Sequence, residues 1–392
     1  MERPGPQIER WDPHGDLRRL VRELSAVAAP TGNEDRLTAA LEAYVRARGW
    51  SVERDRLGQV AVTMGPSDAD TSVMLIAHLD EVGLVVRAID EDGWLRVHRL
   101  GGMPERVLPG LRLVVHTRAG DLPAVVGIKS HHLTHTDEKY VAKPATDLYL
   151  DVGMTSAHEA AAAGIRVGDP TTYAPTWTEF GSDRVSGKSL DNRLGVATML
   201  RVLDDLADDG PAARVHVVFS CLEEFNLMGT LAMARRFRPD IALAVDIVPA
   251  TDTPDLRGEG TSVLGSGVSL SRLTFHGRGT LGGLVPHPGM VRAVEDAASA
   301  SGAGLQYDAV VGCLNDAAYL PMATAEAVAA ISLGIPCRYT HSPVETAQLS
   351  DVVDAATVVT RFARTAHETD LTRGAGQITT EWPDGPPRST GV

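Results

Sequence analysis

The segment 215–229, VHVVFSCLEEFNLMG, starts as an almost wholly apolar run and then carries two adjacent carboxylates, Glu223 and Glu224. A continuous apolar run of this length is typical of a strand that is buried on both faces of a sheet. In open α/β sheets, ligands bind at the carboxyl ends of such strands. Two adjacent negative charges there either extend into solvent or are held by a cation, because unpaired buried carboxylates are costly. The rest of the sequence must decide between these alternatives.

Polar side chains follow other apolar segments in the same way. The segments 72–77, 241–245 and 327–333 each have the pattern of a buried strand and lead into acidic or histidine residues. Asp191 stands just before a segment with helical spacing, where an isolated Asp is usually only an N-cap. We expect the residues at these ends to meet at one edge of a sheet. They are His78, Asp80, Asp191, Glu223, Glu224, Asp246 and His341.

Two imidazoles and five carboxylates in one place would repel one another strongly unless divalent cations neutralised them. A pair of zinc-like ions fits this set, with one His and one terminal carboxylate for each metal and one carboxylate shared by both. A water between the metals would be the nucleophile. One carboxylate must stay outside the ligand set as general base, because a metal-bound carboxylate cannot readily pass on a proton. Neighbouring residues of an extended segment point in different directions, so one Glu of the adjacent pair can bind while the other acts as base.

Charge and composition exclude several classes of protein. The 392-residue chain has a formal net charge of −14 and a pI near 5.4, which argue against binding to nucleic acid or to anionic lipid. No apolar run reaches the roughly 18 to 20 residues of a membrane span, and the first residues lack the apolar core of a signal peptide. The cysteines Cys221, Cys313 and Cys337 are odd in number and far apart, which indicates reduced thiols. We therefore expect a cytoplasmic protein.

The length favours two domains over one. Between 84 and 176, short β-like runs are broken by Gly, Pro and Asp, which indicates a small β domain inserted into an α/β domain. We assign 1–83 and 177–370 to the α/β catalytic domain, 84–176 to the inserted β domain and 371–392 to a disordered tail. Within the insert, the run 130–135 carries three closely spaced imidazoles that fit no known zinc pattern, and we assign them to a surface loop; they are His131, His132 and His135.

Seven motifs make the chain similar to the M42 family of metallopeptidases. They are APTGNEDRL, AHLDEVG, GGMPERVLPG, GKSLDNRLG, CLEEF followed by Gly229, AVDIVPATDTP and RYTHSPVE, in the order and spacing of the family. The resemblance covers about Ala29 to Glu368. It implies a zinc-exopeptidase-like α/β catalytic domain with a mixed sheet, interrupted by a small β domain that mediates association. It also implies a homo-oligomer that assembles from dimers, as the hollow dodecamers of the family do.

The resemblance implies a role for each residue at the sheet edge. Asp191 would bridge two divalent ions, zinc being the expected metal and cobalt or manganese also suited to such ligands. The separate ligands of the two ions would be His78, Asp246, Glu224 and His341. Glu223 would be the general base, and Asp80 would orient the His78 imidazole from outside the ligand set. The expected activity is the removal of N-terminal residues from short peptides.

Three other functions remain open. A dinuclear amidohydrolase or deacylase that acts on a non-peptide amide would use the same cluster, and the chain departs from the usual family sequence at 225–228 and 313–316, where the substrate should run. A glycosidase is a poorer fit, because paired carboxylates alone would need neither the two His nor the bridging Asp. A non-catalytic metal-binding scaffold is disfavoured, because all five ligands and the base are present. Assays of metal content and of aminoacyl versus N-acyl substrates separate these alternatives.

Overall fold

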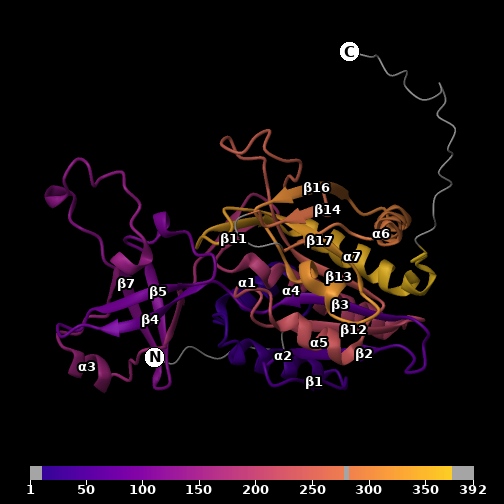
Figure 1. Cartoon of the computed structure of the whole chain (residues 1–392), viewed down its shortest axis with the longest axis horizontal. Coiled ribbons are helices and arrows are strands. Elements are labelled where there is room, and N and C mark those ends of the chain that lie inside the picture. The colour runs from indigo at the N-terminus through magenta and orange to yellow at the C-terminus, as the bar shows by residue number, and fades with distance from the viewer. Residues whose placement is uncertain (1–10, 278–281, 373–392) are drawn as a thin grey trace, which may run out of the picture.

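The computed structural model describes residues 11–277 and 282–372, so most of the tail predicted at 371–392 lies outside the described residues. Figure 1 shows two parts, a large sheet with its covering helices and a smaller β barrel beside it. The α-helices are α1 (Leu17–Ala26), α2 (Asp35–Ala47), α3 (Ala157–Ala162), α4 (Leu190–Asp208), α5 (Gly229–Phe237), α6 (Pro288–Ser301) and α7 (Leu349–Thr365). None of the helices in the described ranges has the length and apolarity that a membrane crossing requires.

The large sheet is mixed. Its main path runs in the order β1 (Glu53–Arg54), β2 (Val60–Met64), β12 (Arg214–Ser220), β3 (Ser72–His78), β13 (Ile241–Pro249), β17 (Ala329–Arg338), β18 (Glu345–Gln348), β11 (Arg184–Gly187) and β10 (Trp177–Phe180). The central strands β12, β3, β13 and β17 are parallel neighbours, whereas the flanking pairs are antiparallel. A branch beside β17 contains β14 (Val268–Phe275), β15 (Gly283–Leu284) and β16 (Leu305–Val311). The predicted α/β class with a mixed sheet is confirmed.

Strand β3 shows why the inner positions of the central strands are mostly apolar. Val73 and Leu75 pack into the core that includes residues of α1, α4 and α7, whereas Met74 and Ile76 pack into a second core that includes residues of α5. All four side chains are fully buried. Because alternate side chains point to opposite faces, a strand that is covered by helices on both faces must be apolar throughout.

The smaller part is a closed barrel with its own hydrophobic core. Its strands, in order around the barrel, are β4 (Gly83–Ile89), β5 (Leu95–Leu100), β8 (Tyr149–Asp151), β7 (Gly120–Val126), β6 (Arg112–Thr117) and β9 (Pro170–Tyr173). Gly83 opens the barrel where the backbone passes close to β9, since a Cβ at this position would lie 2.2 Å from the carbonyl oxygen of Thr171. The predicted small β module is therefore a barrel that starts just beyond the end of β3.

An ion pair joins the barrel to helix α2 of the larger part. Arg36 of α2 donates two hydrogen bonds of 2.7 Å to the carboxylate of Asp121 in β7.

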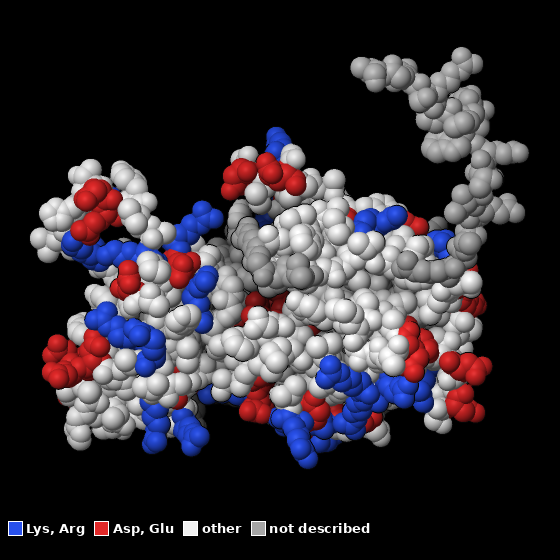
Figure 2. Space-filling model, viewed as in Figure 1, with Lys and Arg blue, Asp and Glu red and all other residues white. Residues whose placement is uncertain are grey.

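On the face of the molecule in Figure 2, basic and acidic side chains are interspersed, and no continuous basic surface extends across the described residues there. This distribution is in keeping with the acidic net charge of the chain.

Two of the central strands are longer than the apolar runs predict. The run 241–245 predicts a strand that ends at Asp246, but β13 continues to Pro249, and β17 continues beyond 333 to Arg338. The two strands pair in parallel register as far as Pro249 and Cys337. Pairing between central strands therefore overrides the low strand propensity of Asp246.

Candidate metal centre

Two groups of side chains at one edge of the sheet could each hold a metal ion. One group is His78, Asp191 and Asp246, the other is Asp191, Glu224 and His341, and within each the ligand atoms lie within 4.8 Å of one another. Asp191 belongs to both groups. Its Oδ1 lies 3.0 Å from Nε2 of His78, and its Oδ2 lies 3.3 Å from Nε2 of His341. The two oxygens of one carboxylate thus face two different imidazoles, as a bridging ligand requires.

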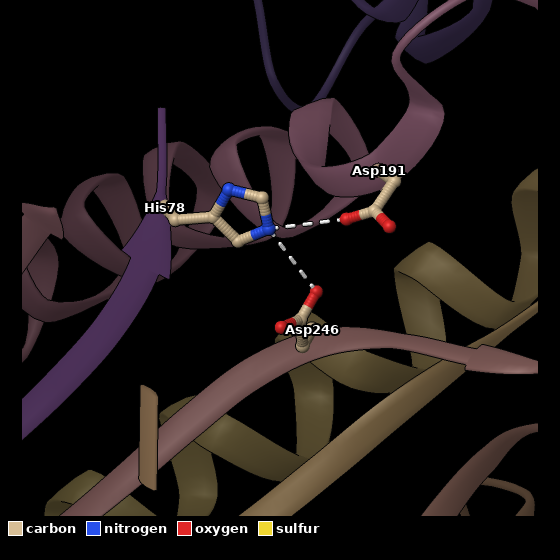
Figure 3. Close-up of side chains that lie close together, drawn as sticks. All are labelled: His78, Asp191 and Asp246. Atoms are coloured by element: carbon tan, nitrogen blue, oxygen red, sulfur yellow. Dashed lines mark hydrogen bonds and ion pairs between the residues drawn. The ribbon is translucent and has the colours of Figure 1, made fainter. Parts of the chain in front are cut away.

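Parallel strands bring these residues together. Figure 3 shows His78 at the end of β3, Asp246 on β13 and Asp191 at the start of α4, with their side chains directed toward one another. Nε2 of His78 lies 3.4 Å from Oδ1 of Asp246. In the second group, Nε2 of His341, which follows β17, lies 3.3 Å from Oε1 of Glu224, which follows β12. The structure therefore brings together all five residues that the resemblance implied as ligands.

Asp191 is not an ordinary N-cap. Ser189 occupies the N-cap position with a left-handed backbone (φ 57°), and Asp191 itself has φ −77° and ψ 104°, outside the helical region.

Asn192, which stands where the family pattern usually has a second Asp, accepts a hydrogen bond from the backbone N–H of Gly195 and donates one to the carbonyl of Val245. A carboxylate could not donate the second of these bonds, so the amide ties the start of α4 to β13.

Glu223 lies beside the two groups without belonging to either. Its side chain is buried, and its charge interacts with those of His78 and Asp246. Asp80 fixes the turn that carries both glutamates, because its carboxylate accepts the backbone N–H of Glu223 at 3.0 Å and that of Glu224 at 2.9 Å. Nδ1 of His78 lies 3.1 Å from the backbone oxygen of Asp80 and 3.5 Å from its Oδ1. Asp80 therefore contacts both the histidine that it was expected to orient and the turn of the adjacent glutamates.

The buried carboxylates of the site repel one another, and a bound cation would reduce this repulsion. Burial, together with the charges of Asp246 and Glu224, raises the pKa of Glu223 well above its usual value. Burial also raises the pKa of Asp246 to about 7, with a further contribution from Asp191. Burial alone would lower the pKa of His78, but the charges of Asp246 and Glu223 raise it well above normal. Several desolvated carboxylates share this space, and divalent ions would relieve their repulsion.

The barrel side of the molecule also reaches the site. Nδ1 of His341 lies 3.2 Å from the carbonyl oxygen of Gly102, and the hydroxyl of Tyr173 in β9 donates a 3.0 Å hydrogen bond to the backbone oxygen of His341. A Cβ at Gly102 would lie 2.7 Å from Nδ1 of His341. The motif GGMPERVLPG therefore needs a glycine at this position so that the backbone can approach the imidazole.

Comparison with known proteins gives the family. The model of the M42 glutamyl aminopeptidases matches residues 58–358. The chain belongs to the M42 family. A glutamyl aminopeptidase of Lactococcus lactis subsp. cremoris MG1363 is 31% identical over 344 residues, which cover 86% of this chain and 93% of that protein.

Solved structures agree with this assignment. The aminopeptidase APDkam598 of the archaeon Desulfurococcus kamchatkensis is 31% identical with a TM-score of 0.84, over 93% of this chain and 99% of that one. The TET1 peptidase of Pyrococcus horikoshii is 25% identical with a TM-score of 0.78, over 89% of this chain and 99% of that one. The predicted resemblance to the M42 family is confirmed, and the protein is a hydrolase of the aminopeptidase class.

Three buried charges of this M42 chain were not predicted from the sequence. Glu81, Lys188 and Arg193 are at most 1% exposed. Glu81 Oε2 lies 2.6 Å from Nζ of Lys188, and its Oε1 lies 3.4 Å from a guanidinium nitrogen of Arg193. Arg193 also donates to the backbone oxygens of Leu24, Val27 and Leu79. The motifs AHLDEVG and GKSLDNRLG contain all three residues. The prediction selected only His78, Asp80 and Asp191 from these motifs.

Asp316 and a group of three histidines lie outside the two ligand groups of the described residues. Asp316 is buried and accepts hydrogen bonds from the hydroxyls of Ser220 and Thr230, which makes it a structural residue beneath the site. The three closely spaced imidazoles that were assigned to a surface loop, His131, His132 and His135, are exposed and belong to neither of the ligand groups among the described residues.

Proposed function

We propose that this chain is a dinuclear metallo-aminopeptidase that removes N-terminal residues from short peptides. The observation that carries the proposal is the bridging geometry of Asp191, whose two carboxylate oxygens face His78 and His341 separately. A carboxylate that faces two imidazoles with separate oxygens can bind two ions at once. Membership of a family of metal-dependent aminopeptidases supports the same reading.

The donor set fits two divalent ions. One ion would be held by His78, Asp191 and Asp246, and the other by Asp191, Glu224 and His341. Imidazole and carboxylate ligands suit zinc, and cobalt or manganese would also be accepted. When bound, the ions would polarise the scissile carbonyl and lower the pKa of the attacking water.

Glu223 supplies the proton transfer. It lies next to both groups but outside them, so its carboxylate is free to take a proton from the attacking water and to give it to the leaving amine. Burial raises the pKa of Glu223, which makes its carboxylate a stronger proton acceptor. Asp80 holds the backbone of Glu223 in place through the 3.0 Å hydrogen bond.

Metal removal gives the first prediction. Treatment with a chelator is expected to abolish hydrolysis of aminoacyl anilides, and added Zn²⁺, Co²⁺ or Mn²⁺ is expected to restore it, because each ligand group lacks its cation after stripping. Elemental analysis of the untreated protein should find two ions per chain. A panel of aminoacyl anilides measures the activity and the preferred N-terminal residue.

The same panel separates the alternatives. N-acylated amino acids serve as the matched substrates, because an amidohydrolase or deacylase would cleave these and spare the aminoacyl anilides. Two bound ions without hydrolysis of either class would identify a metal-binding scaffold. A protein that binds no divalent ion, or that works equally well in excess chelator, would refute the dinuclear mechanism.

A homo-oligomer in the cytoplasm is part of the same proposal. The TET1 peptidase of P. horikoshii is described as assembling into a tetrahedron or a large octahedral shell. The three cysteines of this chain are free, and Cys221 and Cys337 are buried, in keeping with a reducing compartment. Light scattering after size exclusion measures whether the chain forms dimers or the dodecamer expected from the family.

A further inference from the structure

Glu345, the first residue of β18, contacts the backbone of two proposed metal ligands, Asp191 and His341. Its side chain is 2% exposed. One carboxylate oxygen, Oε2, accepts the backbone N–H of Asp191 at 3.0 Å, and the other, Oε1, accepts the backbone N–H of His341 at 2.7 Å. A single rigid carboxylate therefore holds the backbone of the shared ligand and the backbone of a ligand of the second group.

Both of the residues that Glu345 holds lack the support of regular structure. Asp191 has non-helical dihedral angles although it lies at the start of α4, and His341 has φ 63° in the turn between β17 and β18. Their N–H groups are not paired in a helix or a sheet ladder, so the carboxylate is the group that sets their positions. A small shift of either backbone would change the separation of Asp191 Oδ2 and His341 Nε2, which is 3.3 Å.

Glu345 is itself an unfavourable residue to bury here. A carboxylate that is 2% exposed has lost its water, and only hydrogen-bond donors of the protein can replace it. An apolar residue would avoid this cost but would leave two backbone N–H groups without acceptors. Both oxygens are occupied by these donors, and Glu345 belongs to neither ligand group among the described residues. Its contacts are those of a support for the ligands.

We infer that Glu345 is a positioning residue that fixes Asp191 and His341 in the geometry with which they bind a divalent ion. This inference rests on the proposed dinuclear site. It assigns a task to the last residue of the motif RYTHSPVE, in which only the histidine was selected as a ligand. Supporting groups of this kind typically change metal affinity or activity by roughly 10- to 100-fold when they are replaced.

The test replaces Glu345 with Gln, which has nearly the same shape. The amide keeps one acceptor oxygen but directs an NH₂ group at the other N–H donor, so one of the two ligand backbones is released. Chelator-stripped protein is titrated with Co²⁺ alone, by calorimetry and by visible absorption. We expect roughly 10- to 100-fold weaker binding of at least one ion, an altered Co²⁺ spectrum, and a lower kcat with little change in KM.

Asp351 offers a matched control elsewhere in the fold. It is also buried, and its carboxylate accepts the backbone N–H groups of Gly265 and Gly267 at 2.8 and 3.0 Å. Asp351→Asn is therefore the same chemical change at a carboxylate that holds no metal ligand. We expect this variant to unfold at a lower temperature while its Co²⁺ affinity and spectrum equal those of the wild type.

Wild-type Co²⁺ affinity and an unchanged spectrum in folded Glu345→Gln would overturn the inference. If that variant does not fold, Glu345→Asp is titrated instead. It keeps the charge but shortens the side chain, so weaker Co²⁺ binding is expected, and wild-type binding would overturn the inference. Failure of the wild-type protein to hydrolyse any peptide would refute the proposed function and leave the comparison of affinities intact.

Discussion

Glu223→Gln is expected to lower kcat on aminoacyl anilides by roughly 10²- to 10⁴-fold, the usual contribution of a general acid–base group. The amide has almost the same shape as the carboxylate but cannot take a proton from the attacking water. Because Glu223 is a member of neither ligand group, the variant should still bind two ions per chain. Steady-state kinetics and elemental analysis of the same sample measure both parts of the prediction.

Glu224→Gln is the natural control, since the same change is made at the adjacent residue. Glu224 Oε1 lies 3.3 Å from Nε2 of His341, within the second ligand group. This variant is expected to lose metal from the second group, and excess Zn²⁺ should recover part of its activity. The assignment of roles would be wrong if Glu223→Gln lost its metal or kept wild-type kcat, or if the two variants behaved alike.

The meeting of the proposed ligand residues at one edge could be predicted, because it follows from the topology of the sheet. A mostly apolar strand such as β3 or β12 can be recognised in the sequence, and parallel neighbours must present their carboxyl ends at one edge. His78, Glu224 and His341 all lie just at or beyond such ends. Asp246 was found by the same argument, although pairing with β17 carries its strand three residues further.

The supports of the ligands could not be predicted in this way. Glu345 acts on Asp191, which is far away in the chain, through a side-chain to backbone hydrogen bond that leaves no periodic pattern. Gly102 approaches His341 from the barrel side, and only the relative placement of barrel and sheet creates this contact. Both residues lie in the quoted motifs, yet their tasks depend on backbone conformation at positions such as His341, where φ is 63°.

Glu81→Ala is expected to lower the free energy of unfolding by about 3–5 kcal/mol, the cost of removing one partner of a buried ion pair. The carboxylate of Glu81 faces Lys188 and Arg193, and it also accepts the backbone N–H of Ala29 at 2.9 Å. Without it, two cations remain in surroundings that exclude water. Burial lowers the pKa of Lys188, so in the variant this residue should lose its proton more readily, which limits the loss without removing it.

Urea unfolding of the stripped protein measures this loss without a contribution from metal binding. The control is Glu326→Ala, which removes an ion pair of 2.8 Å between side chains that are each 66% exposed, and no resolvable shift of the midpoint is expected. Glu81 follows the strand of His78 and Lys188 precedes Asp191, so the ion cluster also holds these two proposed ligands relative to each other. Metal affinity should therefore fall together with stability in Glu81→Ala. If the urea midpoint of Glu81→Ala equalled that of Glu326→Ala, the buried ion cluster would make no contribution to the free energy of unfolding, and the prediction would be wrong.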